Sequence, residues 1–169
     1  MNSKAESIGA LASSQLSTAN SAWILSKRYW YWMSVLIPAV PLFSGYMAIQ
    51  SGQGIWLWFT VAFLYGLLPL VDLIFGTDES NPSDDLVETL KDQRYYVYIM
   101  YLATFMHWAS LIGMAVIVSQ YDWSWFSILG GAISAGIMNG VGLVAGHELG
   151  HKVNDRAQAN CAKLVLACS

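Results

Sequence analysis

Two histidines and a carboxylate lie close together near the end of the chain, in the segment Gly146-His-Glu-Leu-Gly-His-Lys152. On a helix, the four-residue spacing of His147 and His151 places both imidazoles on one face, with Cβ atoms roughly 5 to 6 Å apart. Such a pair can bind one metal ion or two adjacent ones. Glu148 is turned about 100° around the helix from His147, so it could act as a base on a bound water or orient a ligating histidine. The segment is therefore a candidate metal site.

The histidine motif is compatible with more than one chemistry. His-Glu-x-x-His is also the signature of zinc metalloproteases, in which two histidines and a third ligand bind zinc and the glutamate is the general base. An intramembrane zinc protease is therefore one alternative, and a helical membrane scaffold without catalytic activity is another. Metal content separates three possibilities, because about two iron ions per chain would indicate a bound pair of iron ions, about one zinc ion would indicate the protease, and neither metal would indicate the scaffold.

The remainder of the chain indicates a membrane protein. Of its 169 residues, 56% are hydrophobic and 11% are charged, whereas about a quarter are charged in a typical globular protein. Residues 29–71, 95–121 and 123–147 contain no Asp, Glu, Lys or Arg, and each run exceeds the roughly 20 residues that cross a bilayer. Glycines in Ser51-Gly-Gln-Gly54 divide the first run into a helical hairpin. The sequence predicts an all-α polytopic transmembrane bundle with four spans, at about 29–49, 55–75, 95–119 and 125–145.

The charged residues indicate how the spans are oriented. All eight Lys and Arg residues lie before the first span, between the second and third, or after the fourth, which is one side of a four-span arrangement. By the positive-inside rule, the amino terminus and the segment after His147 face the cytoplasm. We expect residues 1–26 to form a flexible or interfacial tail and residues 27–169 to form the transmembrane domain. The net charge of −3 offers no basic patch for nucleic acid.

Two ionisable side chains are predicted to lie within the spans. Asp72 is about one turn from the cytoplasmic end of the second span, where an unpaired carboxylate costs about 2.5 to 3.5 kcal/mol on insertion. It is expected to have a partner, either a ligating histidine that it orients or one of the interfacial basic residues Lys91, Arg94 and Lys152. His107 lies about 18 Å from the cytoplasmic end of the third span. We expect it to be a neutral structural residue that is hydrogen-bonded to a neighbouring helix.

The motif and its surroundings resemble the bacterial integral-membrane alkane 1-monooxygenases, which belong to the membrane di-iron hydroxylases and desaturases. The resemblance begins at about Tyr29. It rests on the histidine motif, on Pro69-Leu-Val-Asp-Leu-Ile-Phe-Gly-Thr-Asp-Glu-Ser-Asn-Pro82 and on Asn160-Cys-Ala-Lys-Leu-Val-Leu-Ala167. In that family this histidine box is the first of several. Because the sequence stops at Ser169 within an apolar stretch, we expect an incomplete amino-terminal fragment of the hydroxylase domain.

The resemblance implies hydroxylation of the terminal carbon of n-alkanes to primary alcohols with O2. It also implies two non-haem iron ions, and electrons delivered from NADH through a rubredoxin reductase and rubredoxin. His147 and His151 carry over as iron ligands, and Glu148 and Asp72 are candidates to orient them. Two histidines cannot satisfy two iron ions, so the other ligands are expected in the missing carboxy-terminal part and the fragment alone is expected to be inactive. The implied location is the bacterial cytoplasmic membrane, with the metal site on the cytoplasmic side.

Overall fold

The computed structural model describes residues 22, 24, 27–76, 93–150 and 156–168, and the regular elements in these ranges are helical. Four helices are long and apolar enough to cross a membrane: Arg28–Ser51, Gly54–Phe75, Arg94–Gln120 and Trp125–Val144. They coincide with the four predicted spans, so the all-helical class of the prediction is confirmed. The proposed tail at residues 1–26 lies almost entirely outside the described residues, and its boundary with the transmembrane domain stays a prediction.

The first span is interrupted where its prolines lie. It consists of η1 (Arg28–Trp32), α2 (Met33–Leu36), η2 (Ile37–Ala39) and α3 (Val40–Ser51). The 3-10 turn η2 contains Pro38 and is followed closely by Pro41. Proline has no N–H and its ring clashes with the carbonyl four residues earlier, so regular α-helical bonding cannot continue through both positions. The span ends at Gly52, whose φ of 67° is in the left-handed region that glycine adopts without steric cost.

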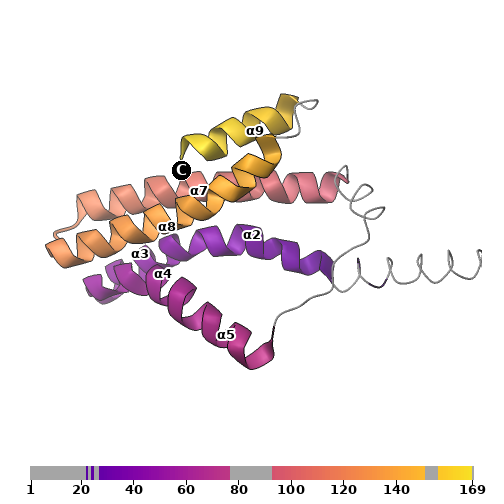
Figure 1. Cartoon of the computed structure of the whole chain (residues 1–169). Coiled ribbons are helices and arrows are strands. Elements are labelled where there is room, and N and C mark those ends of the chain that lie inside the picture. The colour runs from indigo at the N-terminus through magenta and orange to yellow at the C-terminus, as the bar shows by residue number, and fades with distance from the viewer. Residues whose placement is uncertain (1–21, 23, 25–26, 77–92, 151–155, 169) are drawn as a thin grey trace, which may run out of the picture.

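The second span changes its winding before its proline. It runs through η3 (Gly54–Trp58), α4 (Phe59–Ala62), the π-helical turn η4 (Phe63–Leu67) and α5 (Leu68–Phe75), with Pro69 in the first turn of α5. Figure 1 shows α5 diverging from the other helices. The second span, Gly54–Phe75, has the highest mean hydropathy of the four, 1.9, yet only 11% of it is buried, and α5 contains no buried residue. The apolar surface of α5 therefore faces outward.

The third and fourth spans form the centre of the bundle. α7 (Arg94–Gln120) and α8 (Trp125–Gly150) lie side by side, and α9 (Arg156–Ala167) packs across their ends (Figure 1). The buried face of α9 has helical periodicity and consists of Gln158, Cys161, Ala162 and Val165. Both cysteines are free thiols, and burial raises the pKa of the Cys168 thiol above its ordinary value. The return of α9 onto the bundle encloses the region just before the histidine motif.

Buried serines connect the spans through hydrogen bonds. Ser110 Oγ donates to Pro38 O at 2.6 Å, and Ser134 Oγ donates to Leu57 O at 2.7 Å. Ser44 Oγ donates to Trp56 O across the first hairpin. Hydroxyl groups on transmembrane helices bind across helix interfaces in this way, where no water competes for the donor or the acceptor. These bonds fix the register of neighbouring spans.

The contribution of one such bond can be measured. Ser110→Ala is expected to lower the free energy of unfolding by about 0.6 to 1.7 kcal/mol, because Pro38 O loses its interhelical donor. Ser119→Ala is the matched control on the same helix, since the Ser119 hydroxyl is exposed and donates to Val116 O of its own turn. Denaturant titration of the protein in mixed micelles measures both values. Equal effects of the two substitutions would contradict an interhelical role for Ser110.

Candidate functional site

The last turns of α8 place His147 where α9 contacts α8. Gly146 is buried there, and a Cβ added to it would lie 3.1 Å from Leu166 Cγ and 3.2 Å from Val165 Cγ1. The absence of a side chain at Gly146 therefore allows α9 to approach α8 immediately before the histidine. The His147 side chain is exposed at this end of the helix.

The structure describes the other motif residues in part. Glu148 belongs to α8, but its side chain lies outside the described residues. His151 also lies outside them, so its pairing with His147 stays a prediction. In the ranges that the structure describes, no group of three His, Cys, Asp or Glu side chains is close enough to bind a metal ion. An exposed imidazole suits iron or zinc, so His147 fits a ligand role.

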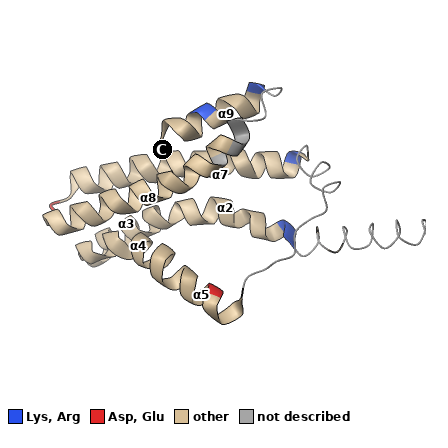
Figure 2. Cartoon of the chain, in the orientation of Figure 1, with Lys and Arg blue, Asp and Glu red and all other residues tan. Residues whose placement is uncertain are grey.

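Asp72 lies on the second span as predicted, within α5. Its side chain is exposed, and Figure 2 shows the acidic residue of α5 on the helix that diverges from α8 and α9. Its backbone carbonyl accepts the Gly76 N–H at 2.8 Å. Lys91 and Lys152, two of the basic partners considered for it, lie outside the described residues. The role of Asp72 in orienting a ligating histidine stays a prediction.

His107 has a different hydrogen-bond partner from the one expected. The side chain is 4% exposed, and its Nδ1 lies 2.8 Å from Ala103 O on the preceding turn of the same helix. The expectation of a bond to a neighbouring helix was therefore wrong. Side chains on a helix point back towards its amino terminus, which brings the ring nitrogen onto the carbonyl four residues earlier. His107 Nε2 is buried and has no hydrogen-bond partner among the described residues.

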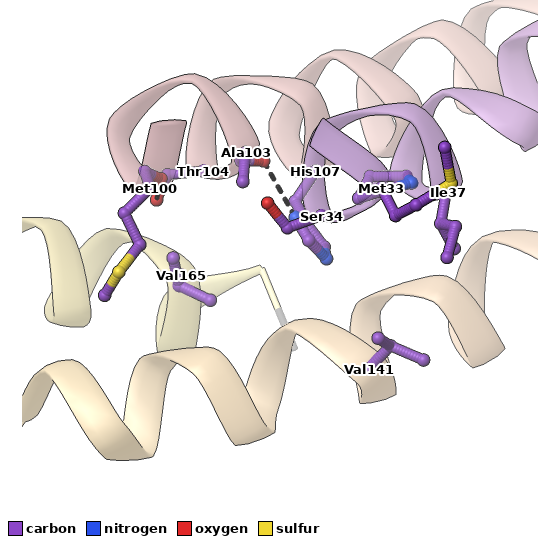
Figure 3. Close-up of a pocket in the computed structure, with 10 residues that line it drawn as sticks. Met33, Ser34, Ile37, Met100, Ala103, Thr104, His107, Val141 and Val165 are labelled. Carbon is purple, nitrogen blue, oxygen red and sulfur yellow. Dashed lines mark hydrogen bonds between the residues drawn. The ribbon is translucent and has the colours of Figure 1, made fainter. Parts of the chain in front are cut away.

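A cavity of about 130 Å³ is lined in part by His107. It lies between the first span, α7, α8 and α9, and Figure 3 shows the His107 ring pointing from α7 towards α8. Apolar side chains form most of its wall, among them Met33, Ile37, Met100, Val141 and Val165. Sequence reasoning treated His107 as structural and did not find this cavity. The signal was present, because an ionisable residue within a span is a functional candidate by default.

Comparison with known proteins shows close relatives. No protein-family model matches the chain. The chain is 41% identical to the alkane 1-monooxygenase of Pseudomonas putida over 145 residues, and 41% identical to alkane 1-monooxygenase 1 of Alcanivorax borkumensis over 148 residues. It is 40% identical to the alkane 1-monooxygenase of Ectopseudomonas oleovorans over 145 residues. These alignments cover 86%, 88% and 86% of this chain and 36% of each relative. The chain thus spans little more than a third of the length of these relatives.

Proposed function

We propose, because this chain is homologous to the alkane 1-monooxygenases over most of its length, that it is the amino-terminal part of a membrane enzyme that hydroxylates n-alkanes. The observation that carries the proposal is 40–41% identity over 86–88% of the chain, together with four helices suited to span a bilayer. The reaction converts a terminal methyl group, O2, two electrons and two protons into a primary alcohol and water. The protein that contains this chain and its downstream continuation is called the full-length protein below.

The proposed enzyme binds two non-haem iron ions, which when bound supply the activation of O2. In this proposal His147 and His151 each contribute an imidazole ligand, and residues downstream of this chain contribute the others. Glu148 and Asp72 orient ligating groups through hydrogen bonds. Since two histidines cannot complete the coordination of two ions, we propose that the chain alone is inactive.

In the proposed enzyme, the alkane reaches the metal site from the lipid and the electrons reach it from the cytoplasm. The outward apolar surface of α5 and the other spans faces the lipid, in which an alkane dissolves. Figure 2 shows the described Lys and Arg residues towards the end of the bundle opposite the turn between α3 and α4, which by the positive-inside rule favours that end as the cytoplasmic side. We therefore propose a bacterial cytoplasmic membrane protein in which rubredoxin, reduced by an NADH-dependent rubredoxin reductase, approaches the metal site from the cytoplasm.

Metal analysis and isotope incorporation test the proposed function together. The full-length protein, purified from cells grown with iron and zinc, is expected to contain about two iron ions per chain. With NADH, rubredoxin reductase, rubredoxin, octane and ¹⁸O2, it is expected to form 1-octanol that carries ¹⁸O, as measured by gas chromatography and mass spectrometry. The 169-residue chain assayed in parallel is expected to form none. About one zinc ion per chain and no labelled alcohol would contradict the proposal and favour the protease alternative.

A further inference from the structure

We propose that Trp108 of α7 is a positioning residue for the metal site, because its indole N–H holds the last turn of α9 where that turn packs on α8. The role of His147 as an iron ligand rests on the proposed function. The contacts that connect Trp108 to His147 are present in the structure. They are a hydrogen bond from the indole to α9, the packing of α9 on Gly146, and the position of His147 next to that glycine.

The indole of Trp108 binds a backbone carbonyl near the end of α9. Its Nε1 donates to Leu164 O at 2.9 Å, and α9 ends at Ala167. A carbonyl oxygen has two lone pairs, so it can accept a side-chain donor in addition to a helical N–H. Trp108 lies about 21 Å along α7 from Arg94, deep within the third span. No water reaches the bilayer core to replace a lost donor there, so the bond holds the last turn of α9 against α7.

A second contact one turn earlier gives the indole bond its place in the α7–α9 interface. Thr104 Oγ1 lies 2.9 Å from Cys161 Sγ, and Met100 packs against the buried cluster that contains Cys161. A thiol is only a weak donor and a weak acceptor. The indole N–H of Trp108 therefore contributes more than the Cys161 thiol to the position of α9.

The turn of α9 that accepts the indole bond is also the turn that contacts the end of α8 (Figure 1). Val165 and Leu166 directly follow the residue whose carbonyl binds the indole. A Cβ added to Gly146 would lie 3.1 Å from Leu166 Cγ and 3.2 Å from Val165 Cγ1. Since the two helices are this close, a shift of α9 changes the packing on the α8 backbone at Gly146. His147 is the next residue, so its imidazole moves with that backbone.

A metal ligand is sensitive to such a shift. Ligating groups must be held within about 0.5 Å of their productive positions, and side chains that orient a ligand commonly change metal affinity by about 10- to 100-fold. Trp108 acts here through two packed segments and does not contact the metal. We therefore expect an effect near the lower end of this range.

Replacing one atom of the indole tests the hydrogen bond without changing the volume of the side chain. 3-Benzothienylalanine carries a sulfur atom in place of the indole N–H, and nonsense suppression introduces it at position 108 of the full-length protein. The loss of the donor to Leu164 O is expected to weaken iron binding about tenfold. Competition with a chelator measures the iron affinity of the purified protein.

Trp58 provides the matched control. Its Nε1 donates to Phe126 O at 3.0 Å, a bond of the same kind in the first turn of α8. Phe126 is about 30 Å from His147 along the helix. The same analogue at position 58 is therefore expected to leave the iron affinity within about twofold of the wild-type value. A purely structural role of interhelical indole bonds would lower the affinity equally at both positions.

Hydrogen–deuterium exchange of the iron-free protein follows the same connection without the metal. The analogue at position 108 is expected to raise the exchange rate severalfold in peptides that cover residues 160–167 and 143–150. The analogue at position 58 is expected to leave both peptides unchanged. This measurement needs neither iron nor turnover, so its result does not depend on the proposed function.

A leucine pair tests the second contact, and it decides the question if the analogue at position 108 prevents folding. Leu166→Ala removes a side chain that packs on Gly146 and is expected to weaken iron binding severalfold. Leu164→Ala is its control, because this side chain is 54% exposed and the substitution retains the carbonyl that accepts the indole. It should leave the iron affinity unchanged.

Several results would overturn the inference. These are an unchanged iron affinity with the analogue at position 108, an equal loss at positions 58 and 108, faster exchange confined to α9, or an unchanged affinity in Leu166→Ala. A full-length protein that binds no iron would reject the proposed function, and the exchange rates would still decide whether Trp108 controls the end of α8. Bound iron and labelled alcohol with an unaffected analogue at position 108 would reject the inference alone.

Discussion

His147→Ala and His151→Ala in the full-length protein are each expected to remove most of the bound iron and to abolish formation of 1-octanol. Each substitution deletes an imidazole that we propose as an iron ligand, and alanine offers no replacement donor. Iron per chain is measured by inductively coupled plasma mass spectrometry on protein that elutes as a single folded species. Activity is measured as ¹⁸O-labelled alcohol formed per chain.

The third histidine of the chain is the matched control for iron binding. His107 lies in the third span and contacts α8 at Gly142, before the motif. His107→Leu is therefore expected to retain wild-type iron, although it changes the polarity of the cavity. Wild-type iron in both His147→Ala and His151→Ala would refute their assignment as ligands. Loss of iron in all three variants would instead indicate a general defect in folding.

Gly130→Ala is expected to destabilise the bundle by about 1 to 3 kcal/mol, because the new methyl group would overlap a rigid side chain. A Cβ at this position would lie 2.8 Å from Trp58 Cε2 and still closer to Nε1 and Cδ1. The indole cannot easily move aside, since its Nε1 donates to Phe126 O at 3.0 Å and its ring stacks on Phe126 at a centroid distance of 4.9 Å. The free energy of unfolding in mixed micelles measures the effect.

Gly136→Ala on the same helix is the control for this effect. A Cβ added to Gly136 meets no atom within 4 Å, so the substitution adds a methyl group without overlap. The alanine also lowers the conformational entropy of the unfolded chain, which favours the folded state by about 0.4 to 1 kcal/mol. We expect Gly136→Ala to be neutral or slightly stabilising. A similar loss of stability in both variants would show that the contact with Trp58 is not the cause.

The sequence predicted the spans well because they are determined mainly by one quantity, the free-energy cost of placing a charged group in the bilayer core. Charged groups are excluded from the bilayer core, so the charge-free runs marked the four helices and the glycines at 52 and 54 marked the turn between the first two. In the structure, the winding of the first two spans changes close to their prolines. The prolines did not indicate the kind of change, which is a 3-10 turn near Pro38 and a π-helical turn before Pro69. That difference depends on tertiary contacts.

The candidate site could be predicted only in part. Spacing identified His147 near the end of the fourth span, and the structure places it there. It did not reveal that α9 returns to the bundle, because that contact depends on the small size of Gly146 opposite Val165 and Leu166. The partner of His107 was also mispredicted, since the pattern of apolar residues shows depth in the membrane but not the direction of a ring. The first fact depends on packing between distant segments, and the second on the conformation of the His107 side chain within its own helix.

The π-helical turn at Phe63–Leu67 determines the direction around the helix axis in which the side chains of α5 point. Such a turn contains one residue more than an α-helical path between the same two levels, and one residue corresponds to about 100° of rotation. Loss of a single residue from this turn would restore regular winding and rotate α5 as a unit. Asp72 would then point in a different azimuthal direction at nearly the same height. An insertion or deletion of one residue here is thus a simple evolutionary route for redirecting this carboxylate.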